Sequence, residues 1–588
     1  MSISKKDIIP HYFHSKSIYY KTNTLKNRYF RDFDNFNLEN MTDSKYNKWY
    51  HPYKPGKEFE KRAAYFSMEF GIHQALKIYS GGLGFLAGSH MRSGFELKQN
   101  MIGIGMLWKY GYYDQGRNED QTLRVNYIEK HYNFLEYTGI EVDVKLHDNP
   151  SVKVRAYVLK PEIFGTVPLY LLSTDFDGND FISRTITDHL YDANELTRIS
   201  QSIILGIGGA KVVEALGGAD IYHLNEGHAL PAFYYLRDQG VKKNQMVFTT
   251  HTPEKAGNEE RDARHLNRCG FFGRRLNEED LSKEMVNDGM INYTVSALRM
   301  AKKANAVSKL HAKVSNDMWK DYKGICKIIP ITNAQNQKFW QDGEIKKIWK
   351  KRNAKAFKER KFELKRKLFD EVANQTVKMF DPNVFTIVWA RRFAGYKRAD
   401  LLLHDMERFE RLITNEKYPV QIIWAGKPYP YDFYAIDIFN HLVNMTKYKP
   451  NLAVLINYEI KLSRKLKTGS DIWLNTPRIT REASGTSGMT AAMNGSVNVS
   501  INDGWIPEFA KNGENSFILP ELDYKLPVWE QDKLDADNLY ELLENKVLPT
   551  YYDKPKDWSK IVFNGMDDVI PEFTSNRMAT QYYKELFK

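Results

Sequence analysis

The stretch from Arg481 to Gly495 reads Arg-Glu-Ala-Ser-Gly-Thr-Ser-Gly-Met-Thr-Ala-Ala-Met-Asn-Gly, and the rest of the chain is best understood from it. Small and hydroxyl-bearing residues crowd its first half, where Gly485 and Gly488 let the backbone approach a ligand closely. From Met489 onward the pattern favours a helix. A loop that opens onto a helix N-terminus offers main-chain N–H groups to an anion, and the Glu482 carboxylate beside it can bind sugar hydroxyls. Composition alone also leaves open an ordinary turn before a helix.

The order of residues in this stretch, with Asp471 to Arg478 before it and Asn502 to Trp505 after it, strongly resembles the signature region of the α-glucan (glycogen and starch) phosphorylases. In that family a lysine follows the methionine of the loop and carries pyridoxal phosphate as a Schiff base. Here Thr490 follows Met489, and a hydroxyl group cannot form an imine. The resemblance therefore implies a short-form member of the family without covalent pyridoxal phosphate. Non-covalent binding of the cofactor stays open.

Bulk composition indicates a large globular protein. With 588 residues the chain is too long for one core and suggests about two to four domains. No stretch approaches the roughly 20 apolar residues of a membrane span, and the N-terminal residues lack the apolar core of a signal peptide, so we expect a cytoplasmic protein. Cys269 and Cys326 make neither a disulfide framework nor a metal site, and we expect no metal.

The formal net charge of +12 is concentrated in one segment. Residues 346–367 hold twelve Lys or Arg against Glu359 and Glu363, with apolar residues interleaved. This pattern predicts an amphipathic helix with a solvated basic face, although an anionic partner is the alternative. We expect no nucleic-acid binding.

Early in the chain, a strand predicted over Ala63 to Glu69 precedes a glycine-rich turn that ends at Gly84 and enters a helix. Glycines between a strand and a helix let backbone N–H groups approach a phosphate. In the phosphorylases, and in related starch and glycogen synthases, a Gly-Gly-Leu-Gly loop faces the donor phosphate. The resemblance thus makes Gly81, Gly82 and Gly84 donor-binding candidates.

Two further strands end in polar residues. The first is followed by Asn225-Glu-Gly-His228 and the second by His251. Taken alone, His228 is more often a structural histidine, but the second histidine of this motif lies beside the transferred sugar in the phosphorylases. The resemblance makes His228 a catalytic candidate and Asn225, His251 and Asn333 sugar-binding candidates. Departures from the family pattern around Asn258 and Asn333 put the acceptor-side contacts in doubt.

In the second half, the apolar strand predicted over Val384 to Ala390 is followed by Arg391-Arg-Phe-Ala-Gly-Tyr-Lys-Arg398. Four cations in eight residues can form a solvated surface, but between a buried strand and a helix they favour an anion. The equivalent family segment binds phosphate groups. The candidates with catalytic roles are His228, Arg392, Lys397 and Glu482. The remaining donor-binding candidates are Arg391, Ser484, Gly485, Thr486 and Gly488.

Strands that alternate with helices predict βαβ units and parallel sheets. We expect an α/β fold with two Rossmann-like domains facing a cleft, the GT-B glycosyltransferase architecture that the resemblance implies. The predicted domains are residues 1–335, with a lead-in and a β-rich insertion, and residues 336–588, whose final helix returns to the first domain. A homodimer is compatible with the sequence.

Three functions remain open at this point. The first is a retaining hexosyltransferase that moves glucosyl units to or from an α-glucan or oligosaccharide without covalent pyridoxal phosphate, with a nucleotide sugar as one donor option. The second is a phosphorylase that uses phosphate or a sugar phosphate and holds pyridoxal phosphate non-covalently. The third is a non-catalytic glucan-binding protein, which the candidate residues disfavour because a polar cleft without a ligand would hold uncompensated charge.

Overall fold

A computed structural model describes residues 49–146, 151–286 and 289–588. The lead-in predicted over residues 1–60 lies mostly outside the described residues. Among the described residues, no helix is long and apolar enough to cross a membrane.

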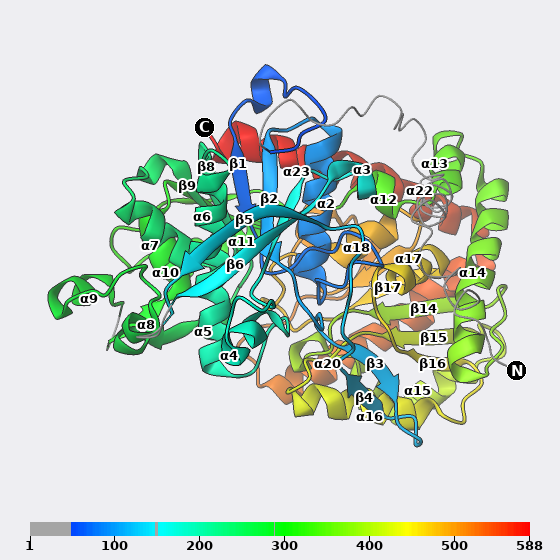
Figure 1. Ribbon diagram of the computed structural model, residues 1–588. Coiled ribbons are helices and arrows are strands. Elements are labelled where there is room, and N and C mark those ends of the chain that lie inside the picture. The colour runs from blue at the N-terminus through cyan, green and yellow to red at the C-terminus, as the bar shows by residue number, and fades with distance from the viewer. Residues whose placement is uncertain (1–48, 147–150, 287–288) are drawn as a thin grey trace, which may run out of the picture.

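A nine-stranded sheet is built from the first part of the chain (Figure 1). Strands such as β1 and β8 are buried along their whole length, as expected for strands covered on both faces. The spatial order is β13-β12-β9-β8-β1-β2-β7-β6-β5. The bounds are β1 Ala63–Phe66, β2 Met101–Met106, β5 Glu136–Val144, β6 Val152–Leu159, β7 Leu169–Ser173, β8 Ile221–Asn225, β9 Met246–Thr250, β12 Lys303–Ala306 and β13 Ile328–Pro330.

This sheet is mixed, whereas the sequence predicted parallel sheets. Strand β6 runs antiparallel to both β5 and β7, and the remaining pairs are parallel. The antiparallel pairs involve β5 and β6, which together span residues 136–159. Their alternating burial, seen in β6, is the pattern of strands with one face toward solvent.

The second sheet has six strands, all parallel, in the order β16-β15-β14-β17-β18-β19. Strands β14 and β15 are buried at every position, which matches their continuous apolar sequence. The bounds are β14 Phe385–Ala390, β15 Val420–Ala425, β16 Leu452–Leu455, β17 Ile472–Asn475, β18 Val497–Ser500 and β19 Ser516–Ile518. The α/β class predicted from the sequence is confirmed.

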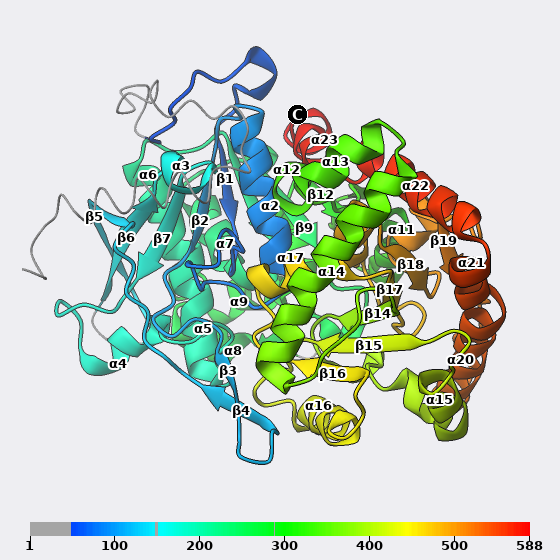
Figure 2. The same cartoon turned by 90° about the vertical axis from the view of Figure 1, so that its right-hand side faces the viewer.

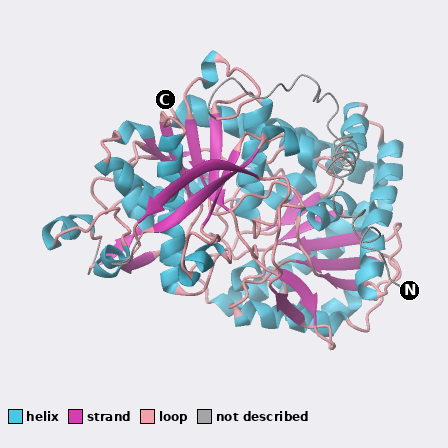
Figure 3. Ribbon diagram, viewed as in Figure 1, coloured by secondary structure: helices cyan, strands magenta, loops and turns pink. Residues whose placement is uncertain are grey.

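Helices surround both sheets (Figure 3). Those following strands of the first sheet are α2 Gly82–Glu96, α3 Pro161–Phe164, α4 Phe181–Arg184, α5 Glu195–Ile203, α6 Gly209–Ala215, α7 Pro231–Asp238, α8 Ala263–Cys269, α9 Glu278–Glu284, α10 Tyr293–Met300 and α11 Lys309–Trp319. Later helices are α12 Gln337–Trp340, α13 Gly343–Lys350, α14 Ala354–Thr376, α15 Met406–Ile413, α16 Phe433–Thr446, α17 Ile460–Gly469, α18 Thr486–Ala492, α19 Ile506–Phe509, α20 Val528–Leu542, α21 Leu548–Asp553, α22 Pro555–Glu572 and α23 Ser575–Gln581.

The basic segment forms two helices, α13 and α14, rather than one helix with a wholly solvated basic face. Two of its lysines are buried instead of exposed. Lys361 donates to the carbonyl oxygens of Thr468, Ser470 and Asn494, and Lys365 pairs with Asp471 at 2.6 Å. Long basic side chains therefore help to attach α14 to the six-stranded sheet, seen at the right of Figure 2.

Two segments link the parts of the chain that carry the two sheets. The hairpin of β3 Asp114–Arg117 and β4 Leu123–Asn126 reaches the second sheet, where Gln115 Nε2 of β3 donates to Gly426 O at 2.8 Å. At the other end of the sequence, α23 packs against α2 (Figure 1), and Ser575 Oγ lies 2.6 Å from Ser93 Oγ. The C-terminal helix α23 thus packs on a helix that follows a strand of the first sheet.

Gly426 allows a close approach that anchors the loop after β14. A Cβ atom at this position would lie 1.9 Å from the carbonyl oxygen of Arg391. We expect Gly426→Ala to lower the free energy of unfolding by about 3 kcal/mol, because backbone must move to relieve the clash. Chemical denaturation measures this, with Gly343→Ala as the matched control because a Cβ there meets nothing within 4 Å. Equal stability of the two variants would contradict the prediction.

Candidate functional site

A cavity of about 880 Å³ lies where loops at the carboxyl ends of strands from both sheets meet. Loops after β1, β8 and β9 line it from the first sheet, and loops after β14, β15 and β17 line it from the second. Ligands of open α/β sheets bind at the carboxyl ends of the strands. The position of this cavity therefore makes it the candidate site.

The glycine loop before α2 is held by Glu69, which follows β1. The Glu69 carboxylate accepts hydrogen bonds from Ser80 N at 2.6 Å and Gly81 N at 3.2 Å, and from the hydroxyl of Tyr191 at 2.8 Å. Gly81 and Gly82 line the cavity, and a Cβ at either would meet nothing within 4 Å. The loop thus presents open backbone, and the positive end of the α2 dipole, to the cavity.

A cluster of three cations and one carboxylate occupies the second-sheet side of the cavity. Lys397 Nζ lies 2.6 Å from Glu482 Oε2, and Arg391 Nη1 lies 3.3 Å from the same oxygen. Burial opposes the charged form of Glu482, but Lys397 and Arg391 outweigh it and hold the pKa of Glu482 below its ordinary value. With Arg392 also lining the cavity, the cluster keeps an excess of two positive charges. It is built to receive an anion.

Several buried polar atoms of residues that line the cavity have no hydrogen-bond partner among the described residues. They are Nε and Nη1 of Arg391, Oγ of Ser484 and Oδ1 of Asn333, and the Arg391 contact with Glu482 lacks hydrogen-bond geometry. Buried polar groups are nearly always satisfied in folded proteins. Unsatisfied groups that converge on a cavity point to a polar ligand as the missing partner.

The two histidines lie on the first-sheet side. Burial, aided by the charge of Arg198, lowers the pKa of His228 to about 4, and burial lowers that of His251 to about 3. Both rings are therefore neutral near pH 7 and suited to hydrogen bonds with hydroxyl groups rather than to binding phosphate. His251 Nε2 is 2.7 Å from Asn225 Oδ1, which fixes the orientation of its ring.

The structure brings most of the predicted site residues together. Lining the cavity are Gly81, Gly82, His228, His251, Asn333, Arg391, Arg392, Lys397, Glu482, Ser484, Gly485 and Thr486. Four predicted residues do not line it, namely Gly84, Asn225, Gly488 and Thr490.

Gly84, Asn225 and Gly488 do not face the cavity but contact or pack against residues close to it. A Cβ at Gly84 would lie 2.6 Å from the Tyr79 side chain, and one at Gly488 would lie 2.4 Å from Asn498 Oδ1, so both glycines serve close packing. Asn225 holds His251. Glycine spacing in a motif predicts a tight backbone but does not say which glycine faces the ligand.

Sequence reasoning missed a pair of charges beside His228. Arg198 on α5 contacts Glu259 at 2.8 Å, and both line the cavity. Arg198 occupies an ordinary position of a helical pattern, and Glu259 lies in a run of charged residues, so neither carried a signal. Tyr396 also lines the cavity; its place beside Lys397 in the cationic segment was the available signal.

The position of the family's cofactor lysine is closed. Thr490 is fully buried in α18, and its Oγ1 donates to Ser487 O at 2.9 Å. The groups around Arg391 and Ser484 suit a phosphate, but residue 490 offers neither an amine nor access to the cavity. Pyridoxal phosphate bound as a Schiff base at residue 490 does not fit these residues.

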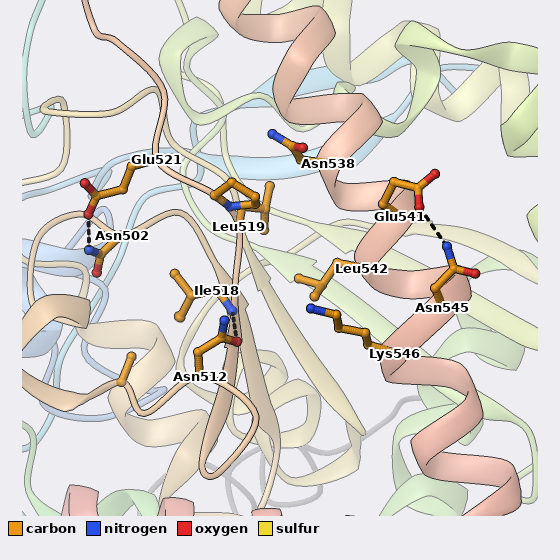
Figure 4. Close-up of a pocket in the computed structure, with 12 residues that line it drawn as sticks. Asn502, Asn512, Ile518, Leu519, Glu521, Asn538, Glu541, Leu542, Asn545 and Lys546 are labelled. Carbon is orange, nitrogen blue, oxygen red and sulfur yellow. Dashed lines mark hydrogen bonds between the residues drawn. The ribbon is translucent and has the colours of Figure 1, made fainter.

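Figure 4 shows a second cavity, of about 570 Å³, formed by residues of the second sheet and α20. Its polar groups are mainly amides and carboxylates that bond to each other, as Asn545 Nδ2 does with Glu541 Oε2 at 2.7 Å. Among the described residues, Lys546 is the one cation that lines it. This cavity lacks the cation cluster and is not the candidate site. In the part of the chain that the structure describes, no cluster of His, Cys, Asp and Glu is arranged to hold a metal ion.

Comparisons with known proteins show which family this chain resembles. The profile of the carbohydrate phosphorylase family matches residues 331–520. Maltodextrin phosphorylase of Thermococcus litoralis is 33% identical over 600 residues, covering 90% of this chain and 71% of that protein. Glycogen phosphorylase of Mycobacterium tuberculosis is 30% identical over 615 residues, covering 89% and 70%. An uncharacterized protein of Methanocaldococcus jannaschii is 46% identical over 532 residues, covering 90% and 100%.

We expect the protein to lose much stability when one member of the buried Lys397–Glu482 pair is removed. Lys397→Met leaves the carboxylate with Arg391 alone, so we expect a loss of about 3 kcal/mol in the free energy of unfolding at pH 7. Because the folded pKa of Glu482 is depressed, its contribution is present above pH 4.5 and is lost as pH falls through the folded pKa. The free energy of unfolding, measured by chemical denaturation, should therefore change less between pH 7 and pH 4 in the variant than in the wild type.

The matched control is Arg411→Met, which removes an exposed partner of Glu407. This change should cost less than about 1 kcal/mol at either pH. A Lys397→Met variant no less stable than this control would show that Lys397 and Glu482 do not form the buried, mutually stabilising pair described above.

Proposed function

The chain belongs to the carbohydrate phosphorylase family, and from this premise we propose that it is a retaining hexosyltransferase that moves glucosyl units to or from an α-glucan. The family consists of glycosyltransferases, and the names of the matched relatives specify maltodextrin and glycogen. The single observation that carries the proposal is the cavity in which Glu482 lies beside Arg391, Arg392 and Lys397 and opposite His228. Sugar-binding and anion-binding groups meet there.

We propose further that the two sheets belong to two Rossmann-like domains, residues 1–335 and 336–588, which face each other across the cavity in the GT-B arrangement. Two features support this division. The strands of the first sheet end at Pro330 and those of the second begin at Phe385. Loops from both sheets line the cavity. A cavity placed in this way lets a donor and an acceptor bind to opposite walls.

The chemistry follows from the charges in the site. In a retaining transfer the leaving group and the acceptor share one face of the sugar, and negative charge develops on the departing oxygen. Arg392 and Lys397 can stabilise that charge, and preorganised cations in a water-poor cavity do so at little reorganisation cost. Ionised Glu482 can accept hydrogen bonds from sugar hydroxyls, and neutral His228 can donate through one ring nitrogen or accept through the other.

The donor is proposed to carry a phosphate group, either as a sugar phosphate or as a nucleotide sugar. The unsatisfied atoms of Arg391 and Ser484 support a phosphate at this end of the cavity. No step is assigned to pyridoxal phosphate, since residue 490 does not fit its Schiff base. A phosphorylase with non-covalently held cofactor and a glucan-binding protein without turnover are the alternatives that a donor screen separates.

Isothermal titration calorimetry tests the proposal with glucose 1-phosphate, nucleotide glucose donors and maltooligosaccharides. We expect the wild type to bind a phosphate-bearing glucosyl donor and an oligosaccharide. Glu482→Gln should lose sugar binding by about tenfold or more, because a charge-assisted hydrogen bond is worth about 1.5–3 kcal/mol. Glu521→Gln is the control, since Glu521 lines the second cavity and bonds Asn502.

Unchanged donor binding in Glu482→Gln would remove Glu482 from the site. Binding of oligosaccharide without any phosphate-bearing donor would favour the glucan-binding alternative instead.

We also expect the purified wild-type protein to hold no lysine-linked pyridoxal phosphate, because Thr490 has no nitrogen to condense with the aldehyde. The measurements are the absorbance spectrum and the intact mass after borohydride reduction. A pyridoxyl adduct on any lysine of the wild type would overturn this expectation.

A further inference from the structure

A cofactor that reached residue 490 would have to pass one face of α18. Ser487, Thr490 and Ala491 are spaced i, i+3 and i+4, so they share that face. Helix α18 contacts α2 and α17, and Ala491 belongs to the same apolar cluster as Phe85 of α2 and Leu466 of α17. A molecule with its phosphate at Ser484 to Thr486 and its aldehyde at residue 490 must lie along the first turn of this face.

Two aromatic rings and a lysine lie together near Ala491. Phe85 of α2 and Trp340 of α12 pack edge to face with ring centroids 5.3 Å apart, in the same apolar cluster as Ala491. Lys467 of α17 places its Nζ 3.8 Å from the centroid of Trp340 and 5.4 Å from that of Phe85. Asn494 joins the two sides, since its Nδ2 donates to both Thr490 O and Trp340 O.

Lys467 differs from the other fully buried lysines of the second sheet. Lys361 donates to three carbonyl oxygens, Lys365 pairs with Asp471, and Lys427 pairs with Glu459 at 3.0 Å. Within the described residues, the contacts of Lys467 Nζ are the two ring faces. Burial, together with the charge of Arg464, holds the pKa of Lys467 well below its ordinary value.

We propose that Lys467 occupies the slot between α18 and the rings of Trp340 and Phe85, and thereby closes the route by which a pyridoxal phosphate ring would reach residue 490. Two residues of this chain thus oppose binding of the cofactor at residue 490. Thr490 removes the amine, and Lys467 fills the space. Burying a lysine without a carboxylate partner is costly, so its side chain is expected to serve as packing that the slot requires. This inference does not depend on turnover or on the identity of the donor.

The two changes predict different results for single and double variants. Proteins are incubated with pyridoxal 5′-phosphate, reduced with borohydride and analysed by intact mass and peptide mapping. Thr490→Lys alone should gain little adduct, because the slot stays filled. Thr490→Lys with Lys467→Val should gain about tenfold more adduct at residue 490, the factor that relief of about 1.4 kcal/mol of steric clash produces.

The matched control is Thr490→Lys with Lys465→Val. Lys465 is on the same helix but pairs with Glu371 at 2.7 Å, away from the rings, so this variant should label like Thr490→Lys alone. Circular dichroism and thermal melts check the fold, and Lys467→Ala serves as a second opening variant if Lys467→Val does not fold.

Three outcomes would overturn the proposal. Thr490→Lys could label as strongly as the double variant, which would show that Lys467 does not block the slot. Both opening variants, folded, could remain unlabelled at residue 490, which would place the barrier elsewhere. The wild type could form its adduct on Lys467 itself, which would make this lysine a reactive amine rather than an occupant.

Discussion

The site depends on one buried interaction, the contact of Lys397 and Arg391 with Glu482. These charges come from two loops of the same parallel sheet, one after β14 and one after β17. Such a cluster is costly to bury, and it is tolerated when the charges neutralise each other and a ligand completes their hydrogen bonds. The neighbouring close contacts, such as that of Gly426 with the Arg391 carbonyl, keep the loops from relaxing away from this geometry. Precise backbone packing thus maintains an electrostatic site.

The two walls of the cavity differ in charge. The second-sheet wall carries the cation excess, and the first-sheet wall carries neutral histidines and the Arg198 and Glu259 pair. The cations of the second-sheet wall suit a phosphate group, and the neutral histidines of the first-sheet wall suit sugar hydroxyls. A donor that contains both groups would span the cavity, which is the arrangement that a group transfer between two substrates requires.

Local sequence predicted much of this fold because its strands are continuous apolar runs bounded by glycine or polar turns. The cationic segment after β14 was found for the same reason, since it follows such a strand directly, whereas His228 was singled out by the resemblance to the phosphorylase motif. The antiparallel placement of β6 was not predictable, because strand direction depends on long-range pairing. The roles of Gly84 and Gly488 depend on neighbours distant in sequence, and the burial of Lys361 and Lys365 depends on acceptors that appear only in the folded chain. Lys467 likewise resembles any lysine of an amphipathic helix until Trp340 and Phe85 are placed beside it.

The central claim is that this site transfers a glucosyl group without a Schiff-base cofactor. The most direct measurement is nuclear magnetic resonance of a mixture of donor and maltooligosaccharide, using protein whose intact mass shows no pyridoxyl group. The account predicts that a phosphate-bearing glucosyl donor is consumed and that the new glycosidic bond keeps the α configuration. It would be contradicted if transfer occurred only after pyridoxal phosphate was added, or if the product carried the inverted configuration.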